Sequence, residues 1–367
     1  MQDLTAYMSK SIEKIMNDAL KIAFKNPKEL FFLLHFYKAQ KKAAKIRENS
    51  ETKNLHIPPF LIASIVTECN LHCAGCYSRA NEKNKTIEQV SNKTCNAAAE
   101  QLPAQRWKQL FAEAERLGIC FILLAGGEPL LRLDVLDFAK DCKNILFPVF
   151  TNGTLINDKY IDFFEQNRNM LPIFSLEGGQ QLTDARRGEG VYEMLCKVMQ
   201  KLQQKNILFG ISITVTKENI KEITEKNFVS NLANKGCSLI FYVEYVPADG
   251  KSASLAPTDT DREYLAERVN RIRETQPLIA ITFPGDEQEF GGCLAAGRGF
   301  FHISAAGNAE PCPFSPYSDL SLKDCSLMDA LQSPLFKKLQ SSELLQAQHS
   351  GGCVLFGQDE AVRAMAE

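Results

Sequence analysis

The sequence is poor in histidine, carries almost no net charge and has no long apolar run. Its five histidines are dispersed, and they form neither a serine–histidine–aspartate pattern nor a metal–histidine pattern. The 42 basic and 44 acidic residues leave a net charge of −2, which argues against a general nucleic-acid-binding protein. No apolar run reaches the length needed to cross a bilayer.

Residues 1–18 mix lysine, glutamate, aspartate and asparagine without an apolar segment, so we expect no secretory signal and a cytoplasmic location. The twelve cysteines are therefore expected to be metal ligands and buried thiols, not a disulfide framework. Five of them are scattered singly and are expected to be core thiols: Cys95, Cys120, Cys142, Cys196 and Cys237.

Three other cysteines, Cys69, Cys73 and Cys76, form a C-x3-C-x2-C cluster directly after an apolar run. A structural zinc site needs four protein ligands, and so does an iron–sulfur cluster held entirely by cysteine. Three thiolates can instead bind three irons of a cubane and leave the fourth iron open to a substrate or cofactor. An incomplete zinc site or three unrelated thiols is the alternative.

Residues 60–283 alternate apolar strands with amphipathic helices, which is typical of βα units around a parallel sheet. We expect strands at 60–66, 119–125, 145–150, 171–176, 207–215 and 238–246, with a further candidate at 278–283. We expect helices at 103–117, 135–142, 158–166, 191–204, 220–234 and 259–275. The pattern predicts an α/β fold: a partial (β/α)6 TIM-like barrel at 58–285, an N-terminal helical segment at 1–57 and a small C-terminal extension at 286–367.

The N-terminal segment is predicted to hold two helices, the second beginning near Pro27, a residue favoured in the first helical turn. Its first half is apolar and its second half, to Arg47, is basic. One interpretation is a helix docked on the barrel with a solvated tail. The other is a helix at a membrane surface, and hence a peripheral membrane contact.

Polar motifs follow the predicted strands at the same end of each. Gly126-Gly127-Glu128-Pro129 follows the second strand, Asn152 the third, Ser175 the fourth and Thr214 the fifth. Barrel active sites are built at these strand ends, although each motif alone could be a turn.

Glu244 and Tyr245 end the sixth strand. They are either substrate-pocket residues or ordinary polar groups of a barrel interior.

The cysteine cluster and the Gly-Gly-Glu-Pro element together resemble the radical S-adenosylmethionine (SAM) superfamily, over residues 58 to about 356. The resemblance implies a [4Fe-4S] cluster on Cys69, Cys73 and Cys76 whose open iron is chelated by SAM. Reductive cleavage of SAM would then give a 5′-deoxyadenosyl radical that abstracts a substrate hydrogen. Many members carry an aromatic residue before the third cysteine. Here that residue is Gly75, and the nearby aromatic, Tyr77, is expected to pack over the cluster.

The resemblance also implies a SAM site. Gly126 and Gly127 would bring backbone carbonyls to the SAM amino group, with Glu128 adding negative charge. Ser175-Leu176-Glu177-Gly178 and the following Asp-Ala-Arg-Arg-Gly resemble the family's hydroxyl and arginine motifs, with glutamate at position 177 where aspartate is usual. Arg187 fits the spacing for a bond to the SAM carboxylate better than Arg186 does. Asn152 and Thr214 complete the candidate set.

Four cysteines of the C-terminal extension resemble the SPASM and twitch extensions of this superfamily, which hold auxiliary [4Fe-4S] clusters. A hairpin around Gly307 would bring Cys293 and Cys312 together, and Gly351-Gly352-Cys353 would supply a third ligand. Cys325 is either the fourth ligand or a core thiol that leaves one iron open. A zinc site of the same four residues is the alternative.

These features predict a radical SAM enzyme, an oxidoreductase or a bond-forming enzyme, whose substrate is a peptide, a tetrapyrrole or a lipid. The reducing electron would come from a flavodoxin or ferredoxin, and no nucleic acid is expected as a partner. The alternative is a non-catalytic iron–sulfur or zinc protein that serves as a scaffold or an electron carrier.

Overall fold

The structure is a computed structural model that describes residues 4–24, 26–80, 100–248, 250, 252–285, 291–347 and 352–367. Two residues singled out in the sequence, Cys95 and Gly351, lie outside this described part.

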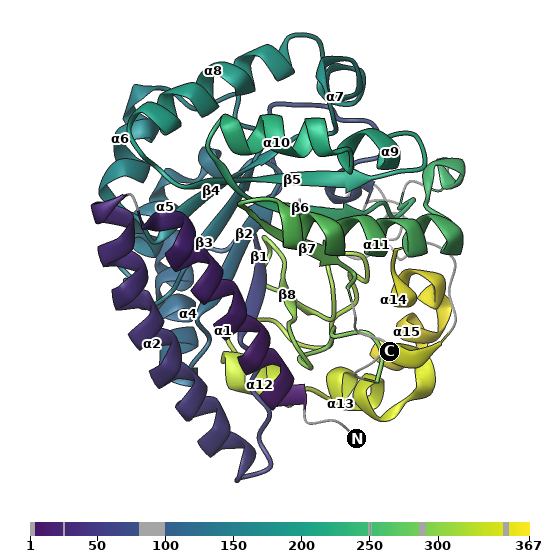
Figure 1. The fold of residues 1–367 in the computed structure, drawn as a ribbon. Helices are drawn as coiled ribbons and strands as arrows, with labels where there is room; N and C mark the ends of the chain where they lie inside the picture. Colours follow the sequence, from purple (N-terminus) through teal and green to yellow (C-terminus); the bar gives the residue numbers. More distant parts are fainter. Residues whose placement is uncertain are drawn as a thin grey trace.

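A curved nine-stranded sheet runs through the molecule in the order β7-β6-β5-β4-β3-β2-β1-β8-β9 (Figure 1). All neighbouring strands pair in parallel except β8 and β9, which form an antiparallel hairpin. Among the described residues β7 and β9 are the two edge strands and do not pair with each other, so the barrel is partial and not closed. The strands are β1 (Phe60–Val66), β2 (Phe121–Gly126), β3 (Phe147–Thr151), β4 (Met170–Ser175), β5 (Phe209–Val215), β6 (Cys237–Glu244), β7 (Ile279–Phe283), β8 (His302–Ile303) and β9 (Ala309–Glu310).

Helices cover the outer face of the sheet, and the N-terminal and C-terminal parts of the chain are also helical. All seven predicted strands, including the seventh candidate, are present with boundaries shifted by a few residues. The helices of the N-terminal segment and barrel are α1 (Leu4–Ala23), α2 (Pro27–Glu51), α4 (Ala104–Leu117), α5 (Leu133–Ala139), α6 (Asp158–Gln166), α7 (Gln180–Arg187), α8 (Val191–Gln204), α9 (Ile220–Ile223), α10 (Lys226–Asn234) and α11 (Asp259–Thr275). The extension adds α12 (Leu327–Leu331), α13 (Pro334–Ser341), α14 (Val354–Gly357) and α15 (Asp359–Ala366), and short 3-10 turns lie at η1 (Pro129–Leu131), η2 (Ala253–Leu255) and η4 (Glu343–Gln346).

The single helix predicted at 220–234 is two helices, α9 and α10, and the prediction was wrong there. The Thr224 hydroxyl donates to the carbonyl of Ile220 at 2.7 Å, and the next residue, Glu225, has extended backbone angles. A threonine that bonds backwards to its own helix competes with the regular ladder. The break follows from that competition. Helix α7 was not predicted, because it is short and strongly polar.

Helix α2 is docked on the barrel as the first interpretation expected. Arg47, in its basic half, is 2% exposed and donates to the carbonyl of Gly118, the residue that ends α4. Gly118 has φ +82°, and a side chain there would lie 2.7 Å from the backbone oxygen of Ala43. Glycine therefore both ends α4 and lets α2 pack closely.

The two faces of the sheet are buried to different degrees. On β2, Ile122 and Leu124 point outward and are buried under helices, whereas Phe121, Leu123 and Ala125 point inward and are only partly buried. The same alternation recurs along β5 and β6. In a closed TIM barrel the inward side chains fill the interior. Here they line a cavity instead.

Within the described residues, no helix combines the length and the apolar character that a bilayer crossing requires.

Candidate active site

A cavity of about 510 Å³ lies inside the curved sheet. It runs from the loops that follow the strands, where Cys69, Cys73 and Cys76 line it, to helix α1. Of the predicted SAM-binding residues, six also line it: Gly126, Gly127, Asn152, Ser175, Arg187 and Thr214. The sequence prediction that these motifs meet at one face therefore agrees with the geometry.

The three cysteines are half-buried on the cavity wall, with hydrogen-bond donors directed at two of them. Asn152 Nδ2 lies 3.8 Å from Cys69 Sγ, and Arg187 Nη1 lies 3.8 Å from Cys73 Sγ. Burial raises the pKa of the Cys69 thiol, and the nearby Glu128, Cys73 and Cys76 raise it further. A bound cation would oppose this rise by stabilising the thiolate forms, and the donors above suit sulfur ligands of an iron cluster.

Among the described residues, no three His, Cys, Asp or Glu side chains are grouped tightly enough to bind a single metal ion. A zinc ion would require all its sulfur ligands about 2.3 Å from one point. Each thiolate of a cubane instead binds a different iron, so the sulfurs stand farther apart.

The Gly126-Gly127 pair lets two backbone segments approach each other. A side chain at either glycine would overlap the backbone oxygen of Val66 or of Glu68. Two backbone hydrogen bonds hold the segments together: the amide of Gly127 donates to the carbonyl of Val66 at 2.8 Å, and the amide of Glu128 donates to the carbonyl of Glu68 at 2.8 Å. The glycines thus hold the loop that carries Cys69.

Glu128 is 1% exposed and bonded on both carboxylate oxygens. Thr151 Oγ1 donates to it at 2.7 Å, the amide of Asn152 at 2.8 Å and the amide of Leu130 at 3.0 Å. Burial raises the Glu128 pKa, and these bonds oppose the rise. The contacts fix the end of β3 and so orient the Asn152 side chain toward Cys69.

Glu177 links the two adjacent arginines of α7. Its Oε1 accepts from Arg186 Nη1 at 2.7 Å and from Arg187 Nε at 2.9 Å, while its Oε2 accepts from the amide of Thr214 at 3.2 Å. Arg186 Nε also donates to the carbonyl of Ala74, between the cysteines, at 3.1 Å. The glutamate that replaces the usual aspartate therefore ties α7 to both the cysteine loop and β5.

Gly75 stands where an aromatic residue is usual before the third cysteine. The tertiary structure shows why a side chain does not fit there. Gly75 has φ +63°, and a side chain there would overlap the ring of Tyr245. Tyr245 is 3% exposed, its hydroxyl bonds to Ser252, and the guanidinium of Arg186 lies 6.0 Å from its ring centroid. An aromatic ring from the residue directly after β6 thus occupies the space beside the third cysteine.

Comparisons with known proteins agree with this geometry. The model of the radical SAM superfamily matches residues 64–226. An AdoMet-dependent heme synthase of Methanosarcina barkeri is 25% identical over 319 residues, covering 78% of this chain and 86% of that protein. The mycofactocin maturase MftC of Mycolicibacterium smegmatis is 24% identical over 331 residues, covering 85% of this chain and 78% of that protein. Residues 64–226 form a radical SAM domain.

The fold of this radical SAM enzyme agrees with solved structures. Streptococcus suis SuiB superimposes with a TM-score of 0.64 at 19% identity, over 92% of this chain and 79% of SuiB. SuiB bound to the precursor peptide SuiA gives a TM-score of 0.62 at 18% identity, over 82% of this chain and 70% of that one. Radical SAM enzymes bind SAM and a [4Fe-4S] cluster, so the family match favours an enzyme over the non-catalytic alternative.

In the C-terminal extension, three cysteines lie near one another: Cys293, Cys312 and Cys353. A hydrogen bond with Cys353, followed by burial and the charges of Cys353 and Cys293, raises the pKa of Cys312 well above its ordinary value. The hairpin expected around Gly307 is present as β8 and β9, with Gly307 at φ +87°. Cys325 has its backbone carbonyl bonded to Arg106 of α4 at 2.6 Å, and its assignment as a fourth ligand stays a prediction.

Sequence reasoning missed a buried chain of polar groups between the two cysteine sites of this radical SAM fold. His302 Nε2 lies 2.8 Å from Ser64 Oγ on β1, and His302 Nδ1 lies 2.8 Å from Glu310 Oε2 on β9. Tyr77, whose ring packs edge-on against Phe314 at 5.1 Å, also bonds Ser64. No sequence pattern joins these residues, because three separate strands and the helical residues after Cys76 contribute them.

The sixth-strand pair also lies in the site of this radical SAM enzyme. Glu244 and Tyr245 both line the cavity. Glu244 is 5% exposed and its Oε1 accepts from Arg262 Nε of α11 at 2.8 Å. Burial raises the Glu244 pKa, and Arg262 opposes the rise. The structure therefore gives Glu244 a positioning contact at the cavity rim.

Proposed function

We propose that this chain reductively cleaves SAM at a [4Fe-4S] cluster on Cys69, Cys73 and Cys76 and abstracts hydrogen from an organic substrate. The observation that carries the proposal is that these cysteines, the glycine pair and Arg187 share one cavity wall. When bound, the cluster and SAM supply the electron and the 5′-deoxyadenosyl radical. The chain supplies ligation, orientation and a sheltered cavity.

In this proposal the residues around the cysteines orient SAM. Arg187, held by Glu177, presents a guanidinium for a charge-assisted bond to the SAM carboxylate. The carbonyls near Gly126 and Gly127 bind the SAM amino group, with Glu128 holding the strand end in place. Three polar side chains, Asn152, Ser175 and Thr214, provide the remaining hydrogen bonds.

The extension at 286–367 would then be an auxiliary-cluster domain beside a radical SAM core at 58–285 and the helical segment at 1–57. The proximity of Cys312 to Cys353 and Cys293 supports one auxiliary [4Fe-4S] cluster on these three residues. Cys325 would be the fourth ligand, or that iron would stay open. The cluster would carry electrons or anchor substrate.

The substrate would be a peptide, a tetrapyrrole or a lipid-like molecule, and a flavodoxin or ferredoxin in the cytoplasm would supply the electron. The similarity to a heme synthase supports a tetrapyrrole, and the similarity to SuiB, solved with a precursor peptide, supports a peptide. A peripheral membrane contact is supported by large apolar side chains exposed on the α1–α2 hairpin. These are Phe24 at 76%, Phe31 at 79% and Leu34 at 47% exposure.

The test is anaerobic reconstitution with iron and sulfide, reduction with dithionite, and measurement of 5′-deoxyadenosine. Cys73→Ala should abolish its formation. Cys142→Ala should leave it unchanged, because Cys142 is half-buried and its thiol bonds to the carbonyl of Phe138 in α5. Cys353→Ala should lose about four irons per chain while retaining some SAM cleavage. Zinc-loaded, iron-free protein without SAM cleavage would overturn the proposal.

A further inference from the structure

The interior of the partial barrel is hollow beyond the cysteine site. On β2, β5 and β6 the inward side chains of Leu123, Ser212 and Phe241 are only partly buried, although their outward neighbours on the same strands are fully buried. On β6, Phe241 and Val243 point inward, whereas Ile240 and Tyr242 point outward and are 0% exposed. Protein interiors are normally packed to the density of organic crystals. An unfilled interior in a rigid sheet therefore indicates a binding space.

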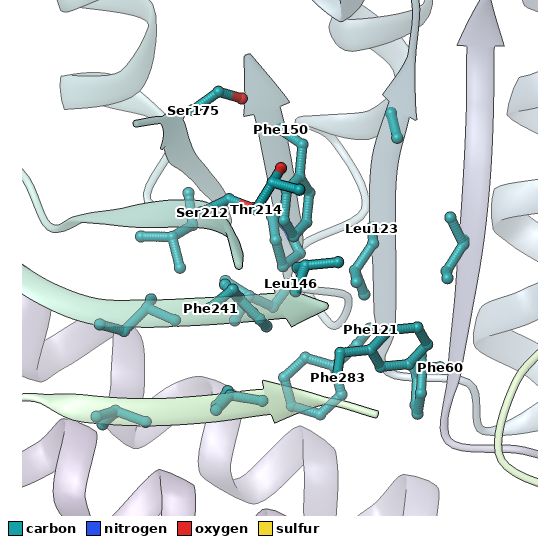
Figure 2. Close-up of a pocket in the computed structure, with 18 of the residues that line it drawn as sticks. Phe60, Phe121, Leu123, Leu146, Phe150, Ser175, Ser212, Thr214, Phe241 and Phe283 are labelled. Carbon is teal, nitrogen blue, oxygen red and sulfur yellow. The ribbon is translucent and has the colours of Figure 1, made fainter. Parts of the chain in front are cut away.

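The cavity has a polar end and an apolar body. Figure 2 shows the hydroxyls of Ser175 and Thr214 at one end, and the rings of Phe60, Phe121 and Phe283 farther along. Ser212 lies two residues before Thr214 on β5 and pairs in register with Phe241 of β6, whose ring centroid lies 5.2 Å from that of Phe150 (Figure 2). The polar end is the end nearest the cysteines, because Ser175 and Thr214 end their strands.

Helix α1 forms the opposite end of the cavity. An apolar stripe at helical spacing lines it: Met8, Ile12, Ile15, Met16, Ala19 and Ile22. Figure 1 shows α1 lying across the strands with α2 beside it, and α1 contacts both α2 and β7. The charged groups at this end, Glu29 and Arg168, pair with each other. Leu208, directly before β5, and Thr214, near its end, both line the cavity, and six residues of extended chain span roughly 20 Å.

We infer that this cavity binds a long, flexible apolar chain, an acyl or isoprenoid chain, with its polar end toward the cysteines. The inference rests on the proposed function, since it names the substrate class of that same site. A peptide would bring an amide N–H and carbonyl with every residue, and each needs a partner when buried. Beyond the hydroxyls of Ser175 and Thr214 the cavity wall is chiefly aromatic and aliphatic. It therefore suits a hydrocarbon chain, whereas the amides of a peptide would be left without hydrogen-bond partners.

Equilibrium dialysis of the full, anaerobically reconstituted chain with radiolabelled hexadecanoic acid tests the inference. We expect saturable binding at one site per chain. Leu123→Trp fills the middle of the cavity and should weaken binding at least tenfold. The matched control, Leu133→Trp on α5, alters a side chain that is 46% exposed and does not line the cavity, so binding should not change.

Ile281→Trp, from the opposite wall on β7, repeats the test if Leu123→Trp does not fold by far-UV circular dichroism. SAM cleavage without substrate is measured on the same preparations. Wild-type protein that cleaves SAM but shows no saturable binding would overturn the inference and leave the proposed function intact. Equal binding by folded cavity-filling variants and the control would overturn it too. Saturable binding without SAM cleavage would instead overturn the proposed function.

Discussion

Removing the guanidinium of Arg168 should destabilise the protein strongly, because its partner is a buried carboxylate. Arg168 precedes β4 and forms an ion pair with Glu29 in the first turn of α2, and their side chains are 8% and 3% exposed. Arg168 Nη1 also donates to the carbonyl of Asn206 at 2.9 Å. Breaking a buried pair by removing one partner costs about 3–5 kcal/mol. We expect Arg168→Met to lose this much free energy of unfolding.

The loss should depend on pH in a definite direction. Burial raises the Glu29 pKa above its ordinary value of 4.5, and Arg168 opposes the rise. The folded protein therefore binds this proton more tightly than the unfolded chain does, which stabilises it at low pH and is lost as pH rises through the folded pKa. Without Arg168 the pKa rises further. The destabilisation should thus be largest at neutral pH and shrink toward pH 4.5.

Urea unfolding of the apo-protein, followed by circular dichroism at both pH values, measures the effect as a shift in midpoint with the slope compared. The control is the double variant Glu29→Met/Arg168→Met, which removes both charges. It should recover most of the stability, since apolar replacements of buried pairs are often neutral or stabilising. Both variants remove Arg168 Nε and Nη2, which are buried and have no hydrogen-bond partner among the described residues, so the comparison isolates the unpaired Glu29 carboxylate. A single variant that loses less than about 1 kcal/mol, or a double variant as unstable as the single one, would refute the reasoning.

Further outcomes follow from other contacts. Gly75→Phe should displace the Tyr245 ring and lower iron retention after reconstitution, measured by iron analysis. Glu177→Gln should weaken SAM binding about tenfold by calorimetry, because the arginines lose a charged partner; unchanged affinity would contradict the assignment. His302→Ala should cost about 2–4 kcal/mol in urea unfolding, because Glu310 and Ser64 lose a buried partner. Phe31→Ser should reduce cosedimentation with anionic vesicles, whereas a similar change at Tyr264, on α11, should not.

The alternation of strands and helices in the barrel was predictable, because the hydrophobic pattern that specifies each element lies within neighbouring residues. The helix at α4 follows from its apolar spacing, with Trp107, Leu110, Phe111 and Ala114 buried on one face and Gly118 ending it. The apolar runs bounded by polar motifs likewise predicted the strands, with boundaries within a few residues of those observed. The break between α9 and α10 was not predicted, since it depends on one threonine hydroxyl bonding to its own helix.

The site was predictable only where its residues lie close in the chain. The three cysteines and the Gly-Gly-Glu-Pro element are short motifs whose spacing carries their chemistry. Glu128 was expected to add negative charge near the SAM amino group, and that expectation stays a prediction. The sequence did not indicate that its carboxylate holds the end of β3 through three hydrogen bonds, because Thr151 and Asn152 donate from a different strand. In the Ser64–His302–Glu310 hydrogen-bond chain, the first two residues are 238 positions apart in the sequence. No local sequence pattern could therefore indicate it.

By itself the sequence determined the family chemistry, the parallel βα order and the position of both cysteine groups, because periodicity and spacing are properties of neighbouring residues. Only the tertiary structure decided that Tyr245 stands in for the side chain missing at Gly75, that Glu177 holds two arginines, and that the barrel interior is hollow. These features depend on how the strands curve and on which side chains meet across the sheet. Such contacts join segments far apart in the chain, so no local pattern encodes them.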